Sequence, residues 1–305
     1  MKSFIDHDSD GAARALSLFR ILLALTLIVQ ALQTAPLLPL LAGERGLMQL
    51  PLNDALAPAA LPRLSWLSAL WESGLATERQ VLYAALTGYT VSLFYLLIGY
   101  RTALFAAVSL VLHLFFKGSA FTSSYGMHEL ATNALFFCIV LPAGRQFCFR
   151  EERGWISTGA AQLFLRLYLT IVYVSSGIEK ATGEMWRSGD AIWSFLMRPE
   201  VTIAGFAWLS RVPWLAPILA WSVLLIETGY FACLFSRRTR TVWFVLTLLL
   251  HLGIAVTYHL WAFSATMTAL NCGALLADVP FVKRGIARTP NAIAISGCRA
   301  TAARR

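Results

Sequence analysis

The chain has 305 residues, of which 58% are hydrophobic and only 13% are charged, and its mean hydropathy is +0.64. Soluble domains are typically about 45–50% apolar and about 25% charged, so this composition excludes a soluble globular protein and predicts an integral membrane protein. The formal net charge of +9 comes from basic residues in loops and in the tail, which is the pattern that membrane topology produces. We therefore expect a lipid bilayer, and no nucleic acid, as the partner of this chain.

Eight apolar runs are candidates for crossing a hydrocarbon core of about 30 Å, which needs about 20 residues. They are Ala15–Thr34, Val81–Ile98, Thr102–Phe116, Glu129–Pro142, Ala160–Lys180, Trp214–Phe235, Val242–Tyr258 and Leu260–Ala277. The third and fourth runs are short, so seven or eight crossings remain open. We expect an all-α, polytopic transmembrane helical bundle of about eight spans. It would consist of a polar segment (residues 1–13), a transmembrane domain (14–278) and a basic, disordered tail (279–305).

Charge in the loops predicts the orientation of the bundle. With eight spans both termini face one side, and that side carries fifteen Lys and Arg residues against eight on the other. Because the richer side is normally cytoplasmic, we expect both termini in the cytoplasm. The outer loops 47–74 and 183–213 are rich in tryptophan, which prefers the headgroup layer. We expect both to form amphipathic cap segments that lie at the interface.

A stripe of polar side chains marks the fifth span. Its members are Gln162, Arg166, Thr170, Tyr173, Ser176 and Lys180. Steps of three and four residues place them on one face of a helix, and polar groups at membrane depth usually face a bundle interior or a wet cavity. Lys180 closes the stripe, and a lysine in a low-dielectric site can act as a base. The alternative is a lysine that extends its ammonium group to the interface.

Other polar residues could join this site. Arg166 needs an anionic or carbonyl partner, and we predict Glu227 in the sixth span, either as a structural ion pair or as part of a binding site. His128, at the start of the fourth span, could relay protons or orient a substrate oxygen, or could be a satisfied helix-end histidine. We take His251 as a further candidate, and Asn271 as a contact between helices.

Metal chemistry is not expected from this sequence. The five cysteines form no CxxC pair and show no metal-ligand spacing. The histidines show no HExxH spacing either. We predict neither a metal site nor a disulfide framework.

Two stretches in and after the fifth span carry a combined motif: Tyr173-Val174-Ser175-Ser176-Gly177-Ile178-Glu179-Lys180 and Trp186-Arg187-Ser188-Gly189. They resemble the core motif of HTTM-domain proteins, the membrane family that includes vitamin K-dependent γ-glutamyl carboxylase. Arg20, Glu227 and His251 match further elements in the same order. The resemblance covers residues 14–278, and bacterial relatives imply a bacterial plasma membrane.

The resemblance implies quinol chemistry. A lysine at the position of Lys180 would deprotonate reduced vitamin K or another quinol. O₂ would then convert the quinol to an epoxide through a strong base, which removes a proton from the substrate before CO₂ adds. His128 would support Lys180 as a second catalytic residue, while Arg166, Tyr173, Glu227, Trp186 and His251 would bind substrate or cofactor.

This chain also departs from the carboxylase pattern. The carboxylase has a large soluble domain after its membrane part, whereas here a short basic tail follows, and its lysine pair is replaced by Glu179-Lys180. We therefore expect epoxidation of a quinol that drives chemistry on a small or peptide substrate, with coupled carboxylation as an extension, and we do not expect carboxylation of a tethered protein. One alternative is a non-catalytic membrane subunit that binds lipid or peptide and a separately encoded soluble partner, for example in peptide maturation. A transporter is a further alternative.

Overall fold

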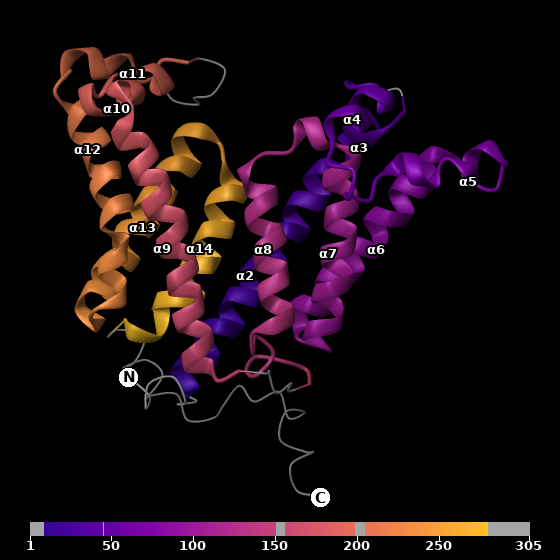
Figure 1. Ribbon diagram of the computed structural model, residues 1–305, viewed down its shortest axis with the longest axis horizontal. Helices are drawn as coiled ribbons and strands as arrows, with labels where there is room; N and C mark the ends of the chain where they lie inside the picture. The colour runs from indigo at the N-terminus through magenta and orange to yellow at the C-terminus, as the bar shows by residue number, and fades with distance from the viewer. Residues whose placement is uncertain (1–8, 45, 151–155, 199–204, 280–305) are drawn as a thin grey trace, which may run out of the picture. The chain divides into compact units, whose positions relative to one another are not determined.

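The computed structural model describes residues 9–44, 46–150, 156–198 and 205–279, and within these ranges all regular secondary structure is helical (Figure 1). The long helices are α2 (Asp10–Thr34), α6 (Glu78–Ile98), α7 (Thr102–Ser119), α8 (Gly126–Val140), α9 (Thr158–Thr182), α12 (Leu215–Thr228), α13 (Arg237–Tyr258) and α14 (Trp261–Leu275). The predicted all-α fold class is confirmed.

Short helices and turns join the long ones. They are η1 (Ala35–Leu37), α3 (Leu38–Ala42), α4 (Leu50–Leu56), η2 (Leu64–Leu67), α5 (Ala69–Glu72), η3 (Phe121–Ser123), α10 (Glu184–Ser188), α11 (Asp190–Leu196), η4 (Ala207–Arg211), η5 (Gly229–Leu234) and η6 (Leu276–Asp278). Several of them occupy the loops predicted as cap segments, and their position at a membrane interface stays a prediction. The predicted polar segment and basic tail lie mostly outside the described residues.

Six helical stretches among the described residues are long and apolar enough to cross a membrane. They are Asp10–Ala42, Glu78–Ile98, Thr102–Ser119, Thr158–Thr182, Leu215–Leu234 and Arg237–Tyr258. Helices α8 and α14 have 15 residues each, or about 22 Å of helix. The chain therefore fits an integral membrane protein, and the expected number of about eight spans depends on these two shorter helices.

The described chain forms two compact units. The first, here called the α6 unit, contains residues 20–44, 46–150 and 156, and the second, the α9 unit, contains residues 9–19, 157–198 and 205–279. Helix α2 contributes its first part to the α9 unit and the rest to the α6 unit.

Arg20 joins three segments of the α6 unit. Its side chain is completely buried, and its guanidinium group donates to the backbone oxygens of Ala143 (3.0 Å), Phe147 (2.7 Å), Leu97 (2.7 Å) and Leu96. A guanidinium group presents five donors in a fixed planar arrangement. Arg20 thereby connects α2 to the end of α6 and to the segment after α8, and in the part of the chain that the structure describes it has no carboxylate partner.

Helices α9, α12, α13 and α14 form the α9 unit, and α10 and α11 lie beyond the ends of α9 and α12 (Figure 1). Close contacts depend on glycine. A Cβ atom added to Gly177 of α9 would lie 2.8 Å from the backbone nitrogen of Thr228 and 3.0 Å from Cβ of Glu227. Gly273 of α14 similarly lies against Phe19 and Leu165.

Candidate functional site

The polar stripe of α9 divides into three clusters centred on Arg166, Tyr173 and Lys180. Seven residues separate neighbouring centres, which corresponds to about 10 Å along the helix axis. Arg166 and Tyr173 are buried, and the side chain of Lys180 is 24% exposed. Apolar residues such as Ile171 and Ile178 are exposed on the helix. The stripe therefore faces the interior of the α9 unit.

Lys180 forms an ion pair with Glu227 of α12. Its ammonium nitrogen lies 2.8 Å from Oε2 and 3.1 Å from Oε1, and it also donates to the hydroxyl of Ser176. The same nitrogen lies 5.5 Å from the centroid of the Trp186 ring, within the range of a cation–π contact. The structure thus brings together Lys180, Glu227 and Trp186, three of the residues singled out from the sequence.

The direction of the Lys180 side chain follows from helix geometry. Side chains in a helix lean toward its N-terminus, and Lys180 reaches back one turn to Ser176. Gly177 lies in that turn and lets Glu227 come close to α9. The ammonium group is therefore held between α9 and α12. This position differs from that of the alternative, in which the lysine extends its ammonium group past the end of the helix to the interface.

Tyr173 lies at the centre of a buried hydrogen-bond network. Its hydroxyl lies 2.7 Å from Nε2 of His251 and accepts a hydrogen bond of 2.8 Å from the side-chain amide of Asn271. The same amide donates to the backbone oxygen of Met267, and its oxygen accepts from Tyr230. The network connects α9, η5, α13 and α14, and its four side chains are at most 3% exposed.

Two buried polar atoms, one in this network and one on the neighbouring helix α14, have no hydrogen-bond partner among the described residues. They are Nδ1 of His251 and the hydroxyl oxygen of Ser264. His251 is 3% exposed and Ser264 5% exposed. The ring of Phe263, next to Ser264 in the chain, contacts the His251 ring at a centroid distance of 5.9 Å. Buried polar atoms are usually satisfied, so these two call for an explanation.

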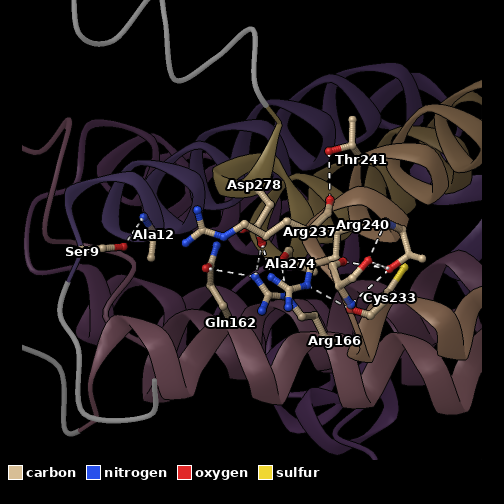
Figure 2. A network of polar contacts seen from close by, with 12 residues as sticks. Ser9, Ala12, Gln162, Arg166, Cys233, Arg237, Arg240, Thr241, Ala274 and Asp278 are labelled. Atoms are coloured by element: carbon tan, nitrogen blue, oxygen red, sulfur yellow. Dashed lines mark hydrogen bonds and ion pairs between the residues drawn. The ribbon is translucent and has the colours of Figure 1, made fainter. Parts of the chain in front are cut away.

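Arg166 belongs to a third cluster, and the predicted pair with Glu227 is wrong. Its guanidinium group lies 2.8 Å from Oδ2 of Asp278, which Arg240 also binds at 2.8 Å. Arg237 lies 3.4 Å from the other oxygen, and Figure 2 shows the three arginines converging on this carboxylate. Eleven residues, about 16 Å of helix, separate Arg166 from Gly177, where Glu227 approaches α9.

His128 belongs to the α6 unit. Its ring lies 5.5 Å from that of His113 and 5.4 Å from that of Tyr125, and Lys117 pairs with Glu129 at 2.6 Å nearby. Burial raises the pKa of the Tyr125 hydroxyl, which precedes α8, above its ordinary value of 10.0. The hydroxyl is therefore protonated at neutral pH.

Several polar residues of these clusters were not assigned to the site from sequence. Asn271 was interpreted only as a contact between helices, although it positions the Tyr173 hydroxyl. The sequence pattern does not single out Tyr230 or Arg240, and it places Asp278 only at the end of the membrane domain. An acidic residue just after the last apolar run was the available signal for Asp278.

The chemistry that these residues can support is proton transfer and binding of an oxygen-bearing ligand. A lysine and a carboxylate within hydrogen-bonding distance can exchange one proton, and a buried histidine can donate or accept. Among the described residues, no group of three or more His, Cys, Asp or Glu side chains is placed to hold a metal ion. The four described cysteines are buried.

Comparisons with family models, with curated proteins and with solved structures each give no match. The relationship to HTTM-domain proteins therefore remains a hypothesis that rests on the residues of the motif.

Proposed function

We propose that this chain is an HTTM-type integral membrane enzyme, similar to vitamin K-dependent carboxylase, in which O₂-dependent epoxidation of a quinol provides a strong base that removes a proton from a small or peptide substrate. The observation that carries the proposal is the Lys180–Glu227 pair, held between α9 and α12 beneath the ring of Trp186. Such a pair offers a base and a proton acceptor at one end of a buried polar stripe.

The residues of the site have separable roles in this proposal. Lys180 accepts the proton of a quinol hydroxyl after its own ammonium proton has moved to Glu227, which lies 2.8 Å away. The ring of Trp186 lies 5.5 Å from the ammonium group and lowers its access to water without closing it, since the Lys180 side chain remains 24% exposed. A bound quinol supplies the electrons with which O₂ is reduced. The unpartnered His251 Nδ1 fits a ligand that carries an oxygen atom.

The resemblance also implies that carboxylation of the substrate could be coupled to quinol epoxidation. Two further residues, Arg166 and His128, have narrower roles in the proposal. Arg166 is bound to Asp278 at 2.8 Å and about 20 Å along α9 from Lys180, so we assign it a structural role. His128 is retained as a second catalytic candidate on the strength of the resemblance alone. The bilayer would supply a lipophilic quinol directly to the site.

The test is O₂ uptake by the purified protein in nanodiscs with a panel of reduced naphthoquinones and benzoquinones. We expect uptake with epoxide formation, and we expect Lys180→Ala and Glu227→Gln each to lower it at least 100-fold, as for removal of a general base. Glu179→Gln changes an exposed neighbour on the same helix and is the matched control. Equal turnover by Lys180→Ala and the unchanged protein would remove the proposal.

The competing function is a non-catalytic membrane subunit that binds lipid, peptide or a soluble partner. One observation favours it: Lys180 is already satisfied by Glu227 and Ser176, which is typical of a structural ion pair. Folded protein that consumes no O₂ with any quinol, yet co-purifies with a partner in a fixed ratio, would make this function the leading one.

A further inference from the structure

The direction of each hydrogen bond around Tyr173 can be deduced from the atoms involved. The backbone oxygen of Met267 can only accept, so the atom of Asn271 that lies 2.9 Å from it is the amide nitrogen. The same nitrogen lies 2.8 Å from the Tyr173 hydroxyl and therefore donates to it. The other side of the amide is then an oxygen, which accepts from Tyr230 at 3.0 Å.

This assignment fixes the proton of Tyr173. With Asn271 donating to its oxygen, the Tyr173 hydroxyl hydrogen needs an acceptor, and Nε2 of His251 at 2.7 Å is the only one among the described residues. Nε2 must therefore be unprotonated. A neutral imidazole carries its single hydrogen on the other nitrogen, so Nδ1 of His251 is a hydrogen-bond donor.

The donor at Nδ1 has no acceptor. His251 is 3% exposed, and no described residue accepts from Nδ1. A buried donor without an acceptor costs about 1–3 kcal/mol relative to a satisfied one. A ligand whose lone pair accepts a hydrogen bond from Nδ1 would remove this cost, and its binding would be favoured accordingly. The second unpartnered atom, the hydroxyl oxygen of Ser264, lies on the adjacent helix α14 near its beginning and can also donate.

We propose that His251 Nδ1, supported by the hydroxyl of Ser264, forms a binding subsite for a carbonyl oxygen of a lipophilic quinone. The quinone as occupant rests on the proposed function, whereas the donor character of the subsite rests on the hydrogen-bond network alone. Tyr173 and Asn271 act as positioning residues, because they hold His251 in the tautomer that presents Nδ1–H. The subsite lies about two helical turns from Lys180, as judged from the Tyr173–Lys180 separation on α9, and belongs to the same unit.

The first test reads the protonation of the His251 ring nitrogens directly and needs no ligand. In the full-length protein labelled with ¹⁵N-histidine and placed in nanodiscs, we expect one histidine with Nδ1 protonated and Nε2 unprotonated, which His251→Leu removes from the spectrum. Tyr173→Phe should release the tautomer preference of that histidine. A His251 that carries its proton on Nε2, or on both nitrogens at neutral pH, would overturn the proposal.

The second test measures binding of oxidised menadione, whose oxygens can only accept. Its carbonyl stretching band should shift to lower frequency on binding, and His251→Leu should abolish the shift and weaken affinity about three- to tenfold, as expected for one hydrogen bond. Ser264→Ala should have a smaller effect in the same direction. The matched control is Thr266→Val, because the Thr266 hydroxyl is buried on the same helix but already bonded to Ala262.

The two proposals fail in different ways. Binding of the oxidised ligand requires no turnover, so it can be measured in Lys180→Ala protein that consumes no O₂. An unshifted carbonyl band in the unchanged protein would mean that buried water alone satisfies Nδ1, and would overturn the subsite. Unchanged affinity in His251→Leu would do the same, and neither result bears on Lys180 as the base.

Discussion

The Lys180 ammonium group and the Glu227 carboxylate lie 2.8 Å apart in a partly buried site. Single and double substitutions of the pair can separate the energy of this contact from the energy of the surrounding packing. Lys180→Met leaves the Glu227 carboxylate without its cation, and Glu227→Leu leaves the ammonium group without its anion. Each should lower the free energy of unfolding by about 2–3 kcal/mol, somewhat less than for a fully buried pair. The double variant should recover most of that loss.

Thermal unfolding of the four proteins in detergent micelles completes this double-mutant cycle. Additive losses would show that the two side chains do not interact energetically. That outcome would also weaken the proposed proton exchange between them, because the exchange requires the contact.

Arg20 is a buried cation with no carboxylate partner among the described residues, and its stabilising effect depends on the geometry of its hydrogen bonds. Arg20→Leu should lower the free energy of unfolding by about 4 kcal/mol, because several buried backbone oxygens lose their donor at once. Arg20→Lys should recover only a small part, because an ammonium group lacks the planar arrangement of donors. The exposed Arg211→Ala is the control and should stay within about 0.5 kcal/mol. Equal stability of Arg20→Lys and the unchanged protein would contradict this explanation.

The polar stripe could be predicted at the residue scale, whereas the partners of its members could not. The face of a helix follows from spacing alone, and the side chains of Arg166, Tyr173 and Lys180 do share one face. Which acidic residue pairs with which cation depends on how far α12 is shifted along α9. Gly177 sets this shift, because its lack of a side chain lets Glu227 approach α9 one turn before Lys180. Apolar runs contain no information on that shift. For this reason the sequence predicts Arg166 as the partner of Glu227, whereas the structure pairs Glu227 with Lys180.

Replacing two glycines in long helices by alanine should change the free energy of unfolding in opposite directions, because only one of the two lies at a close helix contact. Gly177→Ala should lower the free energy of unfolding by about 1–3 kcal/mol, because its new Cβ would lie 2.8 Å from Thr228 atoms and push α12 away. Gly253→Ala in α13 should raise it by about 0.5–1 kcal/mol, because the new Cβ would meet no described atom within 4 Å beyond its own stretch of helix, and alanine is the better helix former. Unfolding midpoints of the two variants measure both effects, and a stabilising Gly177→Ala would contradict the close contact.

The long helices could be predicted from the sequence, because one property, a long apolar run, decides where they form. All eight apolar runs coincide with helices, because a long apolar run in a membrane protein has few other solutions. Their ends were less predictable: α2 begins at Asp10 although its first turn is polar, and α7 continues to Ser119. The tryptophan-rich loops contain several short helices whose packing depends on residues distant in the chain.

Both units contain the same pair of interactions, although the sequence shows no repeat. The α6 unit has the Lys117–Glu129 ion pair and a hydrogen bond of 3.0 Å between Tyr89 and His113. The α9 unit has the Lys180–Glu227 ion pair and the Tyr173–His251 bond. In His113, however, both ring nitrogens are bonded. Only the α9 unit therefore combines this arrangement with an unpartnered histidine nitrogen among the described residues.

Helix α8 decides on which side of the membrane Lys180 approaches the surface. If the 15 residues of α8 cross, with the bilayer locally thinned to match about 22 Å of helix, residues 101 and 150 lie in the cytoplasm and residue 210 lies outside. If α8 does not cross, residues 150 and 210 exchange sides. We expect the first arrangement, because it places more basic residues in the cytoplasm.

Single cysteines at three exposed positions test this topology in a Cys298→Ser background, where the four described native cysteines are buried. In spheroplasts, a membrane-impermeant thiol reagent should label Ser210→Cys, and should label Arg101→Cys and Arg150→Cys only after permeabilisation. Arg101→Cys serves as the reference, because its side does not depend on α8. Labelling of Arg150→Cys in intact spheroplasts would show that α8 does not cross. Lys180 would then approach the cytoplasmic surface, where a soluble partner could reach it, and this topology would favour the membrane-subunit hypothesis over the enzyme.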